Sequence, residues 1–186
     1  MKSIIKLLAF CLVSSLLSNC QRSVELNELS KLVNERMGDS IIFPASIYVA
    51  RTDINLTKTD KIMKYKYTMV VYTDGDCGKC ISDLYQWKLF LKKNRKVLSD
   101  VNEKFIIYSN NFIRFEYTTE KARLFLPYYY DSLNSYTSLN KIDDPVLYTL
   151  LLDNKNKIKL IGSPLHNPAM LKLYQKVLSE SINDED

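Results

Sequence analysis

Short apolar runs separated by polar connections predict alternating strands and helices along most of the chain. Two of these runs, Met69–Tyr72 within residues 65–73 and the stretch 146–153, are apolar at successive positions instead of at every second position. Strands with this pattern are typical of a sheet that is covered on both faces. A shorter run at 104–109 predicts a further buried strand. The pattern therefore predicts a central sheet with helices on both faces.

Apolar residues at helical spacing predict three helices between and after these strands. The first covers residues 77–93. The second covers 119–127 and ends at Pro127. The third begins at Pro168, and Asn167 before it is the predicted capping residue.

The other segments predict edge and connecting structure. Residues 41–50 are rich in strand formers, but their proline predicts an edge strand or a bulged one. The turn residues at 154–157 predict a hairpin, after which 158–161 return as an antiparallel strand. The polar connection at 51–62 and the aromatic region 128–141 predict no regular element.

The N-terminal segment has the pattern of an export signal. Lys2 and Lys6 precede an apolar run, Leu7–Leu17, that is too short to span a bilayer, which takes about 20 residues. This arrangement is typical of a secretory signal peptide. The sequence Leu17-Ser18-Asn19-Cys20 also resembles the lipobox of bacterial lipoproteins. That resemblance implies a signal peptide over 1–19 and lipid on Cys20; the alternative is an ordinary secretory signal that ends near a cysteine.

These expectations divide the chain into four parts. After the signal peptide, residues 20–40 form the lipidated cysteine and a tether or short amphipathic helix, 41–182 form one folded domain, and 183–186 form an acidic tail. The full chain has 26 basic and 21 acidic side chains. Loss of Lys2 and Lys6 leaves 24 basic side chains and a net charge of +3. So small and scattered an excess argues against nucleic acid as a partner.

Only two cysteines then remain as thiols, in the motif Cys77-Gly78-Lys79-Cys80. The motif follows a predicted buried strand and begins a predicted helix, whose N-terminal N–H groups stabilise a thiolate. The sequence therefore predicts Cys77 as the nucleophile. Cys80 lies one helical turn later and can resolve a mixed disulfide. The positive charge of Lys79 favours the thiolate further.

Other roles for this cysteine pair stay open. A structural zinc site needs about four ligands, and Cys77, Cys80 and His166 are the obvious candidates, so we expect no metal and no other cofactor. A purely structural disulfide is possible in an oxidising compartment, although a loop of two residues gives little stabilisation. The pair can therefore be redox-active, structural or vestigial.

Two segments carry a resemblance to a known family. The stretch VVYTDGDCGKCISDLYQWK (70–88) and the later stretch PVLYTLLLDNKNKIKLIGSP (145–164) resemble periplasmic thioredoxin-like reductases. The resemblance covers roughly residues 65–180. It implies an α/β fold of the thioredoxin-like three-layer type, with a mixed central sheet and helices on both faces.

The sequence departs from that family at three points. Asp76 lies where an aromatic residue usually precedes the nucleophile, and its charge would oppose thiolate formation. The strand before the motif lacks the buried acid of thioredoxin, since residues 66–73 contain no carboxylate. The family also has a cis-proline just before the third central strand, facing the cysteines. Pro145 is the nearest candidate, about two residues too early.

Two hypotheses about function follow. The first is a membrane-anchored thiol–disulfide oxidoreductase that acts on envelope protein thiols or disulfides and exchanges electrons with a membrane thiol donor or acceptor. The second is a non-catalytic binding module on the same scaffold, with Cys77 and Cys80 permanently joined. Both place the chain in the cell envelope, attached to the inner or outer membrane and facing the periplasm or the cell surface.

Overall fold

The computed structural model describes residues 26–49 and 65–180. Contacts divide the chain into two units, Met1–Met37 and Gly38–Asp186. In the first unit, residues 26–36 form a helix, one of the two forms that the sequence leaves open for this segment, with an exposed ion pair between Lys31 Nζ and Glu35 Oε1 at 3.9 Å. No helix of the described residues combines the length and apolarity that crossing a bilayer requires. The predicted signal peptide, Cys20, the connection 51–62 and the tail 183–186 lie outside the described residues.

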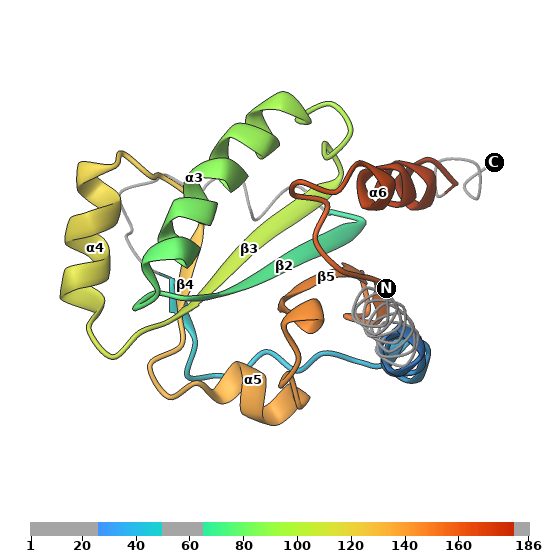
Figure 1. The fold of residues 1–186 in the computed structure, drawn as a ribbon, viewed down its shortest axis with the longest axis horizontal. Coiled ribbons are helices and arrows are strands. Elements are labelled where there is room, and N and C mark those ends of the chain that lie inside the picture. The colour runs from blue at the N-terminus through green and yellow to red at the C-terminus, as the bar shows by residue number, and fades with distance from the viewer. Residues whose placement is uncertain (1–25, 50–64, 181–186) are drawn as a thin grey trace, which may run out of the picture. The chain divides into compact units, whose positions relative to one another are not determined.

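The second unit alternates strands and helices (Figure 1). Its elements, in chain order, are β1 (Tyr48–Val49), β2 (Tyr67–Asp74), α3 (Gly78–Lys93), β3 (Val101–Tyr108), α4 (Phe112–Lys121), β4 (Tyr128–Tyr130), α5 (Ser135–Asn140), the 3₁₀ helix η1 (Pro145–Tyr148), β5 (Thr149–Asp153), β6 (Ile158–Ile161) and α6 (Pro168–Glu180).

The strands form one mixed sheet in the order β1-β4-β3-β2-β5-β6. β2 lies inside the sheet, between β3, which is parallel to it, and β5, which is antiparallel. Its residues Met69, Val70 and Val71 are each 3% exposed or less, because helices or loops cover both faces of the strand. This confirms the prediction of a central strand that is buried on both sides.

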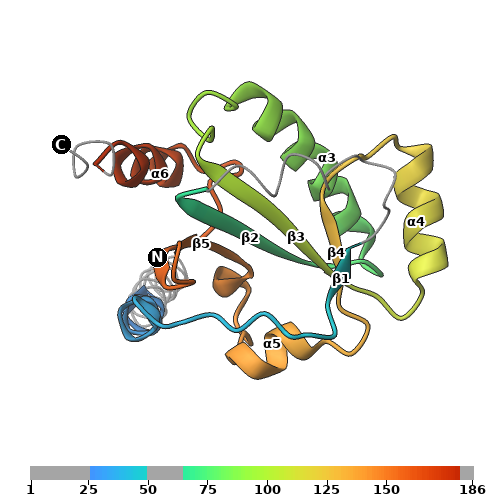
Figure 2. The ribbon, with the colours of Figure 1, turned by 180° about the vertical axis from the view of Figure 1, so that it is seen from behind.

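Helices cover both faces of the sheet, as Figures 1 and 2 show. One face carries the main core cluster, to which β2 and β3 contribute alternate residues, α3 contributes Leu84 and Trp87, and α6 contributes Tyr174. Phe115 of α4 belongs to the same cluster. On the opposite face, the ring of Tyr136 from α5 stacks on Tyr72 of β2 at 6.3 Å. The predicted three-layer arrangement with a mixed sheet is confirmed.

The helix predicted at 119–127 is wrong. The helix in this region is α4, which begins after Asn111, whose side-chain oxygen accepts a hydrogen bond from Arg114 N at 3.0 Å. α4 buries Phe115 and Thr119 and ends at Lys121, with Ala122 as its C-cap, before Arg123 adopts a positive φ of 50°. The position of the cap, and not that of Pro127, decides where this helix lies.

The region 128–141 is also more regular than predicted. Tyr128–Tyr130 form β4, which pairs in parallel with β3, and α5 follows. Two sets of contacts, which no local sequence pattern indicates, hold β4 and α5 in place. Tyr128 and Tyr130 bury their rings against Phe115 of α4, and Asp131 accepts hydrogen bonds from the first N–H groups of α5.

The two edges of the sheet match their predicted character. β1 is a two-residue edge strand that pairs antiparallel with β4. At the other edge, β6 forms the predicted hairpin with β5. Residues 38–41 run beside the start of β6: Ser40 bridges Lys157, and Ile158 N donates to Asp39 O at 2.9 Å. The cap of α6 is also as predicted, since Asn167 Oδ1 accepts from Met170 N at 3.1 Å.

Candidate active site

The cysteine motif follows a tight turn at the end of β2. Asp74 stabilises this turn with two hydrogen bonds: its Oδ1 accepts from Asp76 N at 2.9 Å, and its backbone carbonyl accepts from Cys77 N at 3.4 Å. Gly75 N donates to Tyr108 O at the end of β3 at 2.7 Å. A Cβ on Gly75 would lie 3.0 Å from side-chain atoms of Ile107 and Phe115. The turn therefore needs glycine at this position, because the two strand ends approach each other closely.

Cys77 is the N-cap of α3. Its backbone is extended, with φ −87° and ψ 112°, and its carbonyl accepts from Ile81 N at 3.1 Å in the first helical turn. Its Sγ accepts a hydrogen bond from Cys80 N at 3.2 Å. The helix terminus thus directs an otherwise unpaired N–H group at this sulfur, which is the arrangement that stabilises a thiolate.

Cys77 and Cys80 form a disulfide, with their Cα atoms 5.2 Å apart. Both residues are only half-buried, so their sulfurs lie near the surface. The two residues between them are exposed. A Cβ on Gly78 would meet no atom within 4 Å, so the space around this position does not demand glycine. The side chain of Lys79 extends into solvent one residue before Cys80.

Asp76 is exposed, and its carboxylate is held by the loop that follows β3. Oδ1 accepts from Ser109 Oγ at 2.6 Å, and Oδ2 accepts from Asn110 N at 2.8 Å and from Asn110 Nδ2 at 2.9 Å. These bonds, led by the one from Ser109, lower the pKa of Asp76, and the positive charge of Arg114 acts in the same direction. The carboxylate is therefore charged at neutral pH.

The residues that hold Asp76 form no pattern that the sequence alone reveals. Ser109 is buried, and its hydroxyl also accepts from Asn111 N at 3.0 Å, while Asn111 caps α4. The only sequence signal is a run of Ser and Asn directly after a buried strand, which is typical of helix caps and turns. Ser109 and Asn110 reach Asp76 because the parallel strands β2 and β3 end side by side, with Asp74 opposite Tyr108.

Pro145 does not supply the cis-proline that the resemblance implies. No peptide bond among residues 26–49 and 65–180 is cis. Pro145 is instead the first residue of η1, where its fixed φ suits a helix start, and Asp144 caps this turn by accepting from Val146 N at 2.8 Å. The residue directly before β5 is Tyr148, which packs edge-to-face on Tyr72 at 5.0 Å.

Tyr72 supplies a polar but uncharged group beneath this end of the sheet. Its hydroxyl donates to Asn134 Oδ1 at 2.9 Å. Burial, followed by the nearby Tyr148, raises the pKa of Tyr72, so the phenol stays protonated at any physiological pH. The buried part of the strand, up to Thr73, thus presents a neutral phenol and the apolar Val71, and its one carboxylate, Asp74, lies at the end of the strand in the turn.

Comparison with known proteins supports the fold. No protein-family profile and no curated protein matches the sequence. Among solved structures, the chain is similar to a protein from Bacteroides vulgatus assigned as a thiol-disulfide oxidoreductase. The TM-score is 0.54 at 18% identity, over 74% of this chain and 91% of that one. It is also similar to a protein from Bacteroides thetaiotaomicron assigned as a protein disulfide isomerase. There the TM-score is 0.52 at 16% identity, over 76% and 87% of the two chains.

The fold is thioredoxin-like. In this thioredoxin-like domain, the Cys77–Cys80 disulfide lies between β2 and α3, where the sequence resemblance places the redox motif. At sequence identities of 16–18%, the similarity shows the fold alone, so the chemistry follows only from the site itself.

Two further features lie apart from the disulfide. The described residues contain no group of three or more His, Cys, Asp or Glu side chains placed to hold a metal ion. A hollow of about 780 Å³ lies at the far end of α3, lined among others by Lys92, Arg95 and Glu103. Burial raises the pKa of Glu103, and the positive charge of Arg95 partly opposes this effect. Lys92 is fifteen residues beyond Cys77, roughly 22 Å along the helix, so this hollow is separate from the cysteines.

Proposed function

We propose that this protein is a thiol–disulfide oxidoreductase of the bacterial cell envelope, held at a membrane by lipid on Cys20. The observation that carries the proposal is the position of Cys77: it caps α3 directly after the central strand, and its sulfur accepts the N–H of Cys80, to which it is also joined by the disulfide. A structural disulfide does not require its first sulfur at a helix N-terminus, whereas a nucleophilic thiolate gains from that position.

The proposed reaction is a two-step exchange. The Cys77 thiolate attacks one sulfur of a substrate disulfide, so that a mixed disulfide forms and the other substrate sulfur leaves as a thiolate. Cys80 then loses its proton and attacks Sγ of Cys77, which closes the Cys77–Cys80 disulfide and releases the second substrate thiol. Two electrons pass from the pair to the substrate. A membrane dithiol then reduces the pair by the reverse sequence.

The site suits protein substrates in the cell envelope. The half-buried sulfurs lie at the end of the sheet between exposed Gly78, Lys79 and Asp76, where a disulfide on another protein can approach them. The similar proteins from two Bacteroides species are assigned as a thiol-disulfide oxidoreductase and a protein disulfide isomerase, which supports the same substrate class. The signal-like N-terminus and the lipobox-like Cys20 support a membrane attachment facing the periplasm or the cell surface.

A second candidate function rests on the residue before β5. Tyr148 occupies the position directly before this strand and packs against Tyr72. A site that has lost the family's proline, and whose disulfide stays closed, would act as a non-catalytic binding module. In that case the pair would be structural or vestigial.

The experiment that separates the two functions measures the reduction potential of the Cys77–Cys80 pair in the full-length chain, by equilibration with glutathione or dithiothreitol buffers. A potential between roughly −120 and −270 mV, the span of known oxidoreductases, supports catalysis. A potential below about −300 mV is typical of structural disulfides and would leave the binding module as the function.

Trapping provides an independent test of the assigned roles. Cys80→Ser keeps the nucleophile but removes the resolving thiol, so it should accumulate mixed disulfides with envelope proteins that dithiothreitol releases. Cys77→Ser is the matched control, since it keeps one thiol in the same motif but should trap far fewer partners. Equal trapping by the two variants would contradict the roles assigned to these cysteines. Cys20→Ala should move the protein from the membrane fraction to the soluble one.

A further inference from the structure

Asp76 places a negative charge directly before the nucleophilic cysteine, and the fold keeps that charge in place. Three hydrogen-bond donors from Ser109 and Asn110 reach its two oxygens at distances of 2.6 to 2.9 Å. One of these donors is a backbone N–H, and Ser109 is only 4% exposed. An ordinary surface aspartate has no such set of partners, because water satisfies its oxygens.

The partners of Asp76 are themselves fixed. Ser109 Oγ accepts from Asn111 N at 3.0 Å, and Tyr108 Oη donates to Asn110 Oδ1 at 3.0 Å. The adjacent backbone bond from Gly75 N to Tyr108 O, at 2.7 Å, joins the same turn to the last residue of β3. The turn before Cys77 is thus tied to the end of β3 and the loop after it by four bonds, so that the carboxylate cannot swing away from the motif without breaking several of them.

We propose that Asp76 is a positioning residue for the redox pair, holding a fixed negative charge beside Cys77 that shifts the equilibrium of the pair toward the disulfide. The inference rests on the proposed function and gives a physical cause for its direction, in which the protein donates electrons and reduces substrate disulfides. A negative charge next to Cys77 raises the free energy of its thiolate and leaves the uncharged disulfide unaffected. The reduced form is therefore destabilised relative to the oxidised form.

The charge opposes two features that favour the thiolate. The N-terminus of α3 presents the Cys80 N–H to Cys77 Sγ, and Lys79 adds a positive charge nearby. If Asp76 were neutral, the helix terminus, Lys79 and Arg114 of α4 would still be present, but the negative charge of Asp76 that opposes them would be absent. The charge of Arg114 also acts on Asp76. The pair would then become a stronger oxidant, because stabilisation of the thiolate stabilises the reduced state.

The test compares charge-removing variants in the full-length chain. Asp76→Asn keeps the size of the side chain, and Asp76→Ser keeps a short polar group, but both remove the charge. Equilibration with glutathione at pH 8.5, near the ordinary pKa of a free cysteine, should show a shift of roughly threefold to tenfold toward the reduced protein. A tenfold shift corresponds to about 30 mV. The pH profile of Cys77 alkylation should move to lower pH in both variants.

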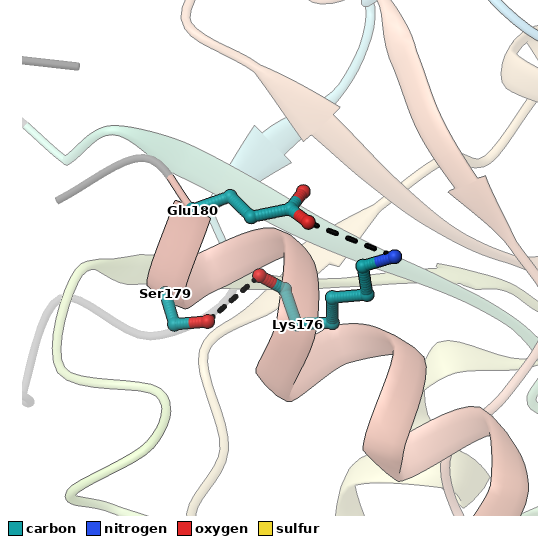
Figure 3. Close-up of polar contacts among 3 residues, drawn as sticks. All are labelled: Lys176, Ser179 and Glu180. Atoms are coloured by element: carbon teal, nitrogen blue, oxygen red, sulfur yellow. Dashed lines mark hydrogen bonds and ion pairs between the residues drawn. The ribbon is translucent and has the colours of Figure 1, made fainter. Parts of the chain in front are cut away.

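Glu180→Gln is the control for loss of one negative charge elsewhere. Glu180 lies in the last turn of α6, where Oε1 is 3.7 Å from Lys176 Nζ (Figure 3). Val177, in that same turn, accepts a bond from Tyr67 Oη at the start of β2. Cys77 lies beyond the other end of this eight-residue strand, roughly 25 Å away. Glu180→Gln should therefore leave both the equilibrium and the alkylation profile unchanged.

The outcomes separate the positioning role from simpler ones. The proposal is overturned if the equilibrium constants of folded Asp76→Asn and Asp76→Ser with glutathione both stay within twofold of that of the unmodified chain. It is also overturned if Glu180→Gln shifts this equilibrium as much as the Asp76 variants do. If the role of Asp76 is purely structural, its substitution should lower the free energy of unfolding but leave the glutathione equilibrium and the alkylation profile unchanged. Failure of the unmodified chain to reduce protein disulfides would overturn the proposed function instead, since the equilibrium shift requires only a reversible pair.

Discussion

Two aspartates at the same end of the sheet show how burial decides what a carboxylate does. Asp76 follows β2 and accepts a backbone hydrogen bond from Asn110, in the loop after the neighbouring strand β3. Asp131 follows β4 and accepts one from Ser135, the first residue of α5. Asp131 is 0% exposed, and it accepts from Ser135 N at 2.9 Å and from Tyr136 N at 2.7 Å, the first N–H groups of α5. Asp76 is exposed and directly precedes Cys77 in the chain.

The difference separates a residue that builds the fold from one that adjusts its chemistry. Both oxygens of Asp131 accept from N–H groups at the start of α5, one part-buried and one buried, so this residue holds the start of that helix in place. Asp76 satisfies donors as well, yet its charge also acts on the neighbouring cysteine. The predictions below test this division, beginning with the largest expected effect.

Asp131→Ala should be the most destabilising of these changes. It removes the acceptor of two N–H groups, that of Tyr136, which is buried, and that of Ser135, which is part-buried, and each unsatisfied buried donor costs roughly 1–3 kcal/mol. We expect the free energy of unfolding in urea to fall by about 3 kcal/mol. The equilibrium of the Cys77–Cys80 pair in the folded variant should stay unchanged; a shift as large as that of Asp76→Asn would break the comparison.

Gly75→Ala should come next. The added methyl group would meet Ile107 Cγ2 and Phe115 Cδ2 at 3.0 Å, and both side chains are fully buried and cannot move aside. Overpacking of this kind typically costs 1–3 kcal/mol, and we expect about 2 kcal/mol in urea unfolding. An unchanged unfolding midpoint would mean that the contact between the ends of β2 and β3 is looser than described.

The hydrogen bonds of Asp76 should make stability depend on pH. Because they lower its pKa in the folded state, their contribution is present above the ordinary aspartate pKa, near 3.9, and is lost as the pH falls through the lower folded pKa. The urea midpoint of the unmodified chain should exceed that of Asp76→Asn at pH 7, and the difference should shrink toward pH 2. Ser109→Ala, which removes the main cause of the shift, should fall between the two. A difference that grows on acidification would contradict the sign.

Gly78→Ala should have the smallest effect. A Cβ at this position meets no atom within 4 Å, so we expect a change in unfolding free energy of less than about 0.5 kcal/mol. Together with Gly75→Ala, it forms a matched pair on either side of Cys77. A larger loss than that of Gly75→Ala would show that the motif, and not the turn before it, is the tightly packed part.

The sequence predicts those parts of the fold that depend on local pattern. The buried runs of β2 and β5, the helix that starts at the cysteine motif and the Asn167–Pro168 start of α6 all have their signals within a few residues. α4 and β4 do not. Their positions depend on Asn111 as a cap and on Phe115 packing against Tyr128 and Tyr130, which are contacts between segments that sequence spacing does not connect.

The candidate site divides in the same way. The two cysteines are visible as a motif, because their chemistry requires three-residue spacing at a helix start. Ser109 and Asn110 are not visible, since they meet Asp76 only through the register that sets Asp74 opposite Tyr108. Pro145 is only the nearest candidate for the family's cis-proline in the sequence, about two residues too early, and in the structure it begins η1, so that Tyr148 lies directly before β5.

The segment 38–41 has a consequence for how the protein behaves when crowded. Open strand edges are templates for pairing between molecules, and copies concentrated on a membrane surface would meet often. Here Gly38 N donates to Ile158 O, Ile158 N donates to Asp39 O, and Ile41 N donates to Asn156 O, so the chain itself occupies the outer edge where β6 begins. The start of β6 thus offers little backbone to a neighbour, which protects this part of the sheet against edge-to-edge pairing.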